Sequence, residues 1–122
     1  MTNLLRTFAC ATLALAPAVA FAAPLDDAQI LEVLHVANTS EINAGKLASS
    51  KAKGADVVAF AKMMIADHSN ADKKGNEVAS EIKVKPKASD VSKKLKTDTD
   101  TDAKNLKAAS AADFDRVYMD AM

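Results

Sequence analysis

The feature that most constrains this chain is a pair of long apolar stripes with the period of an α-helix, separated by a very short link. In the second stripe small or apolar residues and one histidine recur in steps of four and three: Val57, Ala61, Met64, His68, Ala71, Gly75, Val78 and Ile82. The first stripe has the same spacing and includes one glutamate: Ile30, Leu34, Ala37, Glu41, Ala44 and Ala48. Because only two or three residues around Gly54 connect the two expected helices, these helices should lie side by side and antiparallel.

Start and stop signals give the expected bounds of these two helices. An aspartate cap at Asp26 or Asp27 opens the first, which should run to about Lys53. Asp56 is expected to cap the second, and Lys85-Pro86 should end it, because the residue before a proline resists the helical conformation.

Two further helices are expected after Pro86. Ser89 or Asp90 opens the third, whose middle, Thr97–Asp102, has poor helix propensity. We interpret this segment as a mobile, solvated stretch of a marginal helix; a site for a hard cation is the alternative, although the glycine and the closing glutamate of a calcium-binding loop are missing. Ser110 and Asp113 form a capping box for the fourth helix.

The fourth helix carries a short apolar stripe and is expected to be cut off part-way along it. Phe114, Val117 and Tyr118 belong to that stripe, and the sequence stops at Met122. We therefore expect three helices plus a truncated fourth, in a domain of residues 23–122 that is incomplete at its C-terminus. Phe114, Val117 and Tyr118 should then form an exposed apolar patch through which the chain could form a homo-oligomer.

Composition agrees with an all-α fold and excludes one class of partner. Three glycines, three prolines and 4% aromatic residues are too few for a turn-rich, all-β protein. Sixteen basic and sixteen acidic residues cancel, and the lysines are interleaved with acids. This balance gives no electrostatic footprint for nucleic acid.

Residues 1–22 have the pattern of a cleavable signal peptide. Arg6 precedes an apolar stretch, and Ala20-Phe21-Ala22 supplies the small-x-small signature for cleavage before Ala23. The mature form should then lack a transmembrane segment and reside in the periplasm. The single cysteine, Cys10, lies in the leader, so the mature chain has no disulfide and no attachment site for haem c.

Glu41 and His68 are the two polar exceptions within the stripes. With the link centred between residues 54 and 55, facing positions add up to about 109, as 41 and 68 do. Three interpretations are open: a structural pair bonded to each other or to a buried water, a metal site, or two side chains at the rim. Met64 lies one turn before His68 and could add a thioether ligand, which would favour copper; iron, zinc and manganese are the other candidates. His35, three residues after Glu32, is expected to be a partly exposed helix residue.

No nucleophile elbow, phosphate-binding loop, zinc-protease motif or dinucleotide fingerprint occurs in the chain. We therefore expect a non-catalytic envelope protein of unknown specific role, related to stress, rather than an enzyme. A periplasmic metal-binding or redox module is the alternative.

Three segments resemble a bacterial envelope family called domain of unknown function 4142. They are 27–52, which includes Glu41-Ile42 and Gly45-Lys46-Leu47-Ala48, then 58–68, and finally 112–118. The resemblance spans about residues 25–122 and implies a ferritin-like four-helix bundle. Members are often labelled outer-membrane proteins, which implies an association with that membrane. Other members continue past the position of Tyr118 with further histidines, which the resemblance implies as additional ligands beside Glu41 and His68.

Overall fold

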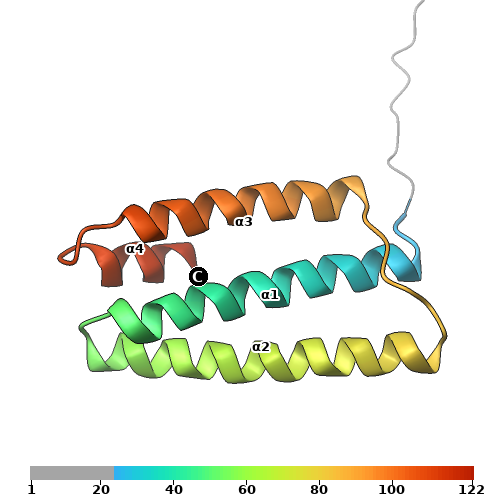
Figure 1. The fold of residues 1–122 in the computed structure, drawn as a ribbon, viewed down its shortest axis with the longest axis horizontal. Coiled ribbons are helices and arrows are strands. Elements are labelled where there is room, and N and C mark those ends of the chain that lie inside the picture. Colours follow the sequence, from blue (N-terminus) through green and yellow to red (C-terminus); the bar gives the residue numbers. More distant parts are fainter. Residues whose placement is uncertain (1–23) are drawn as a thin grey trace, which may run out of the picture.

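The computed structural model describes residues 24–122, which form four helices: α1 (Asp27–Lys51), α2 (Ala55–Glu81), α3 (Asp90–Ala108) and α4 (Phe114–Ala121). The predicted all-α class and the antiparallel α1–α2 hairpin are confirmed. Figure 1 shows α1 between α2 and α3, with α3 parallel to α1 and the short α4 beside α3. The predicted signal peptide, residues 1–22, lies outside the described residues. None of the described helices is long and apolar enough to cross a membrane.

The α1–α2 hairpin begins with the predicted cap, and its link consists of residues 52–54. Asp26 and Gln29 form a capping box at the start of α1, with Asp26 Oδ1 accepting from the Gln29 amide at 2.8 Å. α2 begins at Ala55 with Gly54 as its N-cap, so the prediction that Asp56 caps this helix is wrong. A Cβ built on Gly45 would lie only 3.0 Å from the Ala61 carbonyl oxygen. The glycine therefore permits α1 and α2 to approach closely.

α2 ends four residues before the predicted stop at Lys85-Pro86. Lys83 has a φ of 56°, the left-handed conformation that usually requires glycine. The Val84 amide donates to the Ala79 carbonyl at 2.9 Å, and the Lys83 amide donates to Ser80 at 3.2 Å. These two bonds form a Schellman motif, in which the last carbonyls of the helix are satisfied. The helix therefore ends through this motif rather than at Pro86.

α3 is a continuous helix that includes Thr97–Asp102, and the mobility expected of this segment stays a prediction. Ser89 caps the helix through a reciprocal bond with Ser92, as expected. Lys94 pairs with Asp98 at 2.6 Å, and Lys96 pairs with Asp100 at 2.9 Å. These pairs, one helical turn apart, favour the helix over its poor propensity. The described residues contain no group of three or more His, Cys, Asp or Glu side chains that could hold a metal ion, so the alternative of a cation site in this segment finds no support.

The core lies at the end of the bundle where α1 turns into α2 and where α4 packs. Its buried members come from all four helices: Ala48, Ala61, Leu106, Phe114 and Tyr118. Phe114 is 1% exposed and Tyr118 is fully buried. The prediction that Phe114 and Tyr118 belong to an exposed patch for homo-oligomers is therefore wrong, and Val117 also packs against the core.

A carboxylate on α4 anchors this core to the hairpin turn. Asp115 Oδ2 accepts from the Gly54 amide at 2.7 Å, and Asp115 Oδ1 accepts from the Lys53 amide at 3.1 Å. The prediction that Ser110 and Asp113 form a capping box for this helix is wrong: the N-cap of α4 is Asp113, whose side chain makes no capping bond, and the bond from the Asp113 amide to Ser110 Oγ at 3.1 Å lies in the turn before the helix. Charge-assisted bonds to backbone amides are strong. The bonds of Asp115 to the two backbone amides therefore hold the first turn of α4 against the α1–α2 link.

Candidate functional site

His68 is joined to α1 through Asn38. Its Nδ1 lies 3.0 Å from Asn38 Oδ1, and Asn38 is buried in the seam between α1 and α2. Because the amide oxygen is an acceptor, Nδ1 is the donor in this bond, and in the neutral form of the ring Nε2 has a lone pair. The stripes predict Glu41 as the partner of His68. The observed partner, Asn38, lies three residues before Glu41, almost one helical turn.

The difference follows from where the link is centred. α1 ends at Lys51 and α2 begins at Ala55, so the link is centred on residue 53 rather than between 54 and 55. Facing positions then add up to about 106 instead of 109, and 38 and 68 satisfy the new register. The second interhelical pair, His35 with Asp72, obeys nearly the same register.

Glu41 lies next to His68 and Asn38, and one of its carboxylate oxygens is buried. Its Oε2 is buried and has no hydrogen-bond partner among the described residues. Burial raises the pKa of Glu41, and attraction to the nearby His68 offsets part of that increase. The structure therefore brings Glu41 and His68 into the same part of the seam, although the bond of His68 Nδ1 goes to Asn38.

Tyr118 forms a cluster of four polar side chains with Asn38, Glu41 and His68. The sequence pattern did not identify Tyr118 as a polar member of the seam. Its hydroxyl is buried without a hydrogen-bond partner in the described part of the chain. Burial raises the pKa of the phenol, and the neighbouring charge of Glu41 raises it further. The ring packs edge-on against Phe60, with centroids 6.2 Å apart and planes at 62°. Thus α4 closes the seam beside Glu41 with an aromatic ring.

Met64 and His35 complete the residues singled out from the sequence. Met64 is half-buried on α2, one turn before His68. His35 has an exposed side chain, as expected, and its Nδ1 lies 2.8 Å from Asp72 Oδ1, a partner on α2 that the spacing from Glu32 did not suggest. Across residues 24–122 no group of three or more His, Cys, Asp or Glu side chains is placed to hold a metal ion. A role of Glu41, His68 and Met64 as metal ligands therefore stays a prediction.

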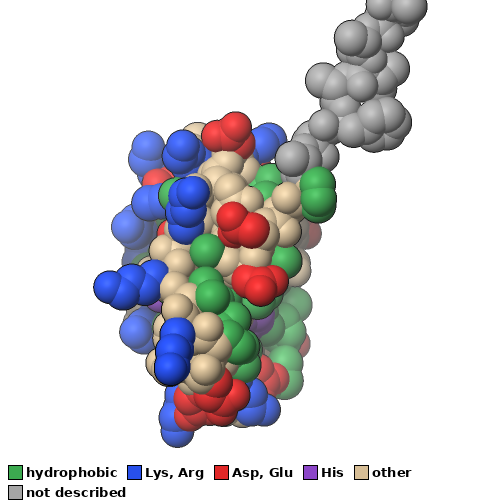
Figure 2. Space-filling view, turned by 90° about the vertical axis from the view of Figure 1, so that its right-hand side faces the viewer, with side chains coloured by type: hydrophobic (Ala, Val, Ile, Leu, Met, Phe, Trp, Pro, Cys, Tyr) green, Lys and Arg blue, Asp and Glu red, His purple; other side chains and the backbone are tan. Residues whose placement is uncertain are grey.

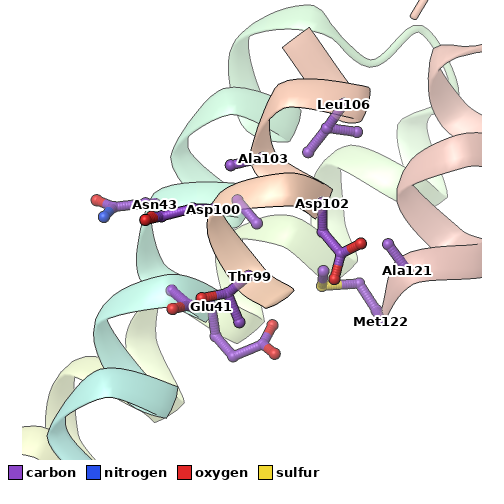
Figure 3. Close-up of a pocket in the computed structure, with 11 residues that line it drawn as sticks. Glu41, Asn43, Thr99, Asp100, Asp102, Ala103, Leu106, Ala121 and Met122 are labelled. Carbon is purple, nitrogen blue, oxygen red and sulfur yellow. The ribbon is translucent and has the colours of Figure 1, made fainter. Parts of the chain in front are cut away.

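A pocket of about 100 Å³ opens beside Glu41, between α1, α3 and the end of α4. Its lining includes Thr99, Asp102 and Met122. Figure 3 shows the carboxylates of Glu41 and Asp102 on the same side as Met122, whereas Asn43 and Asp100 point to the opposite side. Asp100 is already paired with Lys96. The pocket therefore gives the half-buried Glu41 carboxylate access to solvent.

Replacing Glu41 with glutamine is expected to raise the free energy of unfolding at pH 7. Because burial raises the pKa of Glu41 above that in the unfolded chain, ionisation costs stability as the pH rises from about 4.3 through the raised value. The gain should stay below about 1 kcal/mol, since solvent reaches this carboxyl. Urea unfolding at pH 7 and pH 4 measures it.

The advantage of Glu41→Gln should disappear at pH 4, where the wild-type carboxyl is largely protonated. Glu77→Gln is the control, because Glu77 is a solvent-exposed acid on α2. A gain for Glu41→Gln that is equal at both pH values would contradict the assignment.

The fold and this site define a small all-α protein whose helical hairpin carries a polar group within its seam. The chain belongs to the family described as Domain of unknown function (DUF4142), whose model matches residues 12–122. No curated protein and no solved structure matches the chain. The family and the four-helix architecture are thus established, and the ferritin-like character stays a prediction.

Proposed function

We propose that this chain is an exported, non-catalytic helical-bundle protein of the bacterial envelope, with a ferritin-like arrangement of its helices. The observation that carries the proposal is the use of both histidines as links between α1 and α2. His68 binds Asn38, and His35 binds Asp72. Imidazole is the side chain best suited to proton transfer near neutral pH, and here each ring is bound to a side chain of the other helix.

The periplasmic location and the link to stress are part of this proposal. They are supported by the signal-peptide pattern of residues 1–22 and by the resemblance to envelope proteins. Association with the outer membrane is proposed on the same resemblance. In the periplasm the bundle would act by binding, with its polar seam setting the register of the hairpin.

Export is tested by expressing the full chain in a bacterial host and fractionating the cells. The periplasmic product is expected to begin at Ala23 when its intact mass is measured. Ala22→Asp is the matched control, because a charged residue at the cleavage position should leave the precursor uncut. A wild-type chain that stays in the cytoplasm with its leader attached would disprove export. Specific turnover by purified residues 23–122, abolished in His68→Ala, would disprove the non-catalytic assignment.

A metal-binding or redox module is the second candidate, and one feature of the seam favours it. Metal-bound histidines usually donate their second ring nitrogen to an oxygen acceptor, which orients the ring. Asn38 accepts such a bond from His68 Nδ1, so Nε2 is the nitrogen that could bind an ion, and Glu41 Oε2 has no hydrogen-bond partner among residues 24–122. Glu41 and His68 would hold the ion, and Met64 would favour copper over iron, zinc or manganese.

Calorimetric titration of residues 23–122 with copper, iron, zinc and manganese salts tests this candidate. If His68 is a ligand, His68→Ala should abolish the binding heat, and Glu41→Gln should weaken it. His35→Ala is the control, because it removes the chain's other imidazole, which is bound to Asp72. Equal heats for His68→Ala and wild type, or no heat with any of the four metals, would rule the metal site out.

A further inference from the structure

Two polar atoms of the seam are buried without hydrogen-bond partners among residues 24–122. They are Glu41 Oε2 and the hydroxyl oxygen of Tyr118, and no other buried side-chain nitrogen or oxygen atom in this part of the chain shares that state. Tyr118 is fully buried, so its hydroxyl cannot turn to solvent. Buried polar groups in proteins are almost always paired, so two exceptions in one seam indicate a group that binds to both of them.

The two unpaired atoms belong to the same region of the bundle. Leu106 and Ala44 pack in the same core as Tyr118, and both also line the pocket beside Glu41. Ala121, three residues after Tyr118 on α4, lines this pocket too, and Figure 3 shows the Glu41 carboxylate pointing to the side on which Ala121 lies. The charge of Glu41 is close enough to raise the pKa of Tyr118, yet the carboxylate and the hydroxyl do not hydrogen-bond to each other. A third group can therefore bind between them.

His68 supplies another donor atom in this region. Burial raises the pKa of Glu41 and the charge of His68 lowers it, which places the imidazole near the carboxylate. Asn38 binds Nδ1 of the ring and fixes its orientation, so Nε2 is the nitrogen that could bind an ion. Helices α1, α2 and α4 thus contribute a carboxylate oxygen, an imidazole nitrogen and a phenol oxygen to one part of the seam.

We propose that Tyr118 is the third ligand of a metal site with Glu41 and His68, and that this site binds ferric iron. The inference rests on the metal-binding candidate above and selects one of its metals. Carboxylate and phenolate are hard oxygen donors, which suit an ion of high charge, whereas the soft thioether of Met64 suits copper. Tyrosine is an axial ligand of iron in some haem proteins. The choice between Tyr118 and Met64 as the third ligand therefore decides between iron and copper.

Binding requires a path to the site and the loss of the phenol proton. The pocket of about 100 Å³ beside Glu41 opens to solvent and provides the path. When Tyr118 binds the ion, its O–H bond breaks, the oxygen keeps the electron pair, and the proton leaves to water. The phenolate and the carboxylate together neutralise two of the three charges of the ion, as a buried charge requires. The oxidation state of the iron does not change.

Titration of purified residues 23–122 with ferric nitrilotriacetate at pH 7, followed by visible absorption, tests the proposal. Tyr118 is the only tyrosine in the chain, so a charge-transfer band from phenolate to iron can have no other source. Wild-type protein should develop this band and reach a plateau at equimolar iron. Tyr118→Phe should lose the band and bind iron roughly tenfold or more weakly, since even the loss of a group that orients a ligand has that effect. Circular dichroism verifies that this variant, which keeps the buried ring, retains the fold.

Met64→Leu is the matched control, because it removes the thioether from the seam and leaves the three proposed ligands in place. It should keep the band, whereas His68→Ala and Glu41→Gln should each weaken iron binding. The band is needed as the readout because acids on the surface can also hold ferric iron loosely. Figure 2 shows such Asp and Glu side chains scattered over the end of the bundle opposite the α1–α2 link. Bound iron without the band would therefore count against the proposal.

Three results would overturn the proposal: no band in wild type, an undiminished band in both His68→Ala and Glu41→Gln, or loss of the band in Met64→Leu. The calorimetric titration separates this failure from that of the metal-binding candidate. Heat from copper or zinc that depends on His68, without a ferric band, would keep the metal site and reject Tyr118 as its ligand. The absence of binding with any of the four metals would reject both.

Discussion

Tyr118→Ala is expected to lower the free energy of unfolding by about 3–5 kcal/mol, the range for removing an aromatic ring from a protein core. Tyr118 is fully buried, and its ring contacts Phe60 edge-on. Its surroundings include Ala48 and Ala61, whose short side chains cannot move to fill the space left behind. Urea unfolding followed by circular dichroism measures the loss.

Tyr118→Phe separates the ring from its hydroxyl. The hydroxyl is buried and has no hydrogen-bond partner in the part of the chain that the structure describes, so its removal should leave stability unchanged or raise it slightly. If Tyr118→Ala fails to fold, Tyr118→Leu keeps most of the buried volume and should still lose stability measurably. A loss of more than about 1.5 kcal/mol for Tyr118→Phe would show that the hydroxyl makes a bond of its own.

Gly45→Ala is expected to destabilise the protein by about 1–2 kcal/mol, although alanine is the better helix former by about 1 kcal/mol. The new Cβ would lie 2.9 Å from Ile65 Cγ1 and 3.0 Å from the Ala61 carbonyl oxygen. The isoleucine can rotate away, but the carbonyl is part of the α2 backbone. The helices must therefore separate, and the packing along the seam weakens. Thermal unfolding of the variant compares directly with wild type.

Gly75→Ala is the matched control, because it makes the same change within a neighbouring helix. A Cβ on Gly75 meets nothing within 4 Å, so this variant should gain about 0.5–1 kcal/mol from helix propensity alone. Opposite signs for the two variants would demonstrate that α1 and α2 touch at Gly45. A gain of equal size in both would contradict the close approach.

Helix period and the short link predict the hairpin because both properties are local. The period identifies the inner face of each helix, and the link leaves no choice but an antiparallel neighbour. The register is less predictable, since it depends on which residues form the link. The shift of its centre from between residues 54 and 55 to residue 53 gives His68 a bond to Asn38. Asn38 lies outside the apolar stripe and gives no sign in the sequence that it is buried.

The burial of the fourth helix was harder to predict, because the residues that surround it are distant from it in the sequence. Its apolar stripe alone does not reveal that Ala48, Ala61 and Leu106 form a pocket for Phe114 and Tyr118. The segment Thr97–Asp102 differs for another reason. Its intrinsic propensity is poor, but ion pairs from Lys94 and Lys96 and the burial of Leu106 outweigh that preference.

The grip of Asp115 on the hairpin turn makes the two ends of the bundle unequal. Because the carboxylate holds the amides of both Lys53 and Gly54, the turn cannot loosen without releasing α4. We therefore expect the α1–α2 link and α4 to unfold together, as one cooperative unit. At the opposite end of the described residues, the bond from the Lys87 amide to the Ala28 carbonyl joins the beginnings of α3 and α1, and the last turns of α2 take no part in that bond, so they can fray separately.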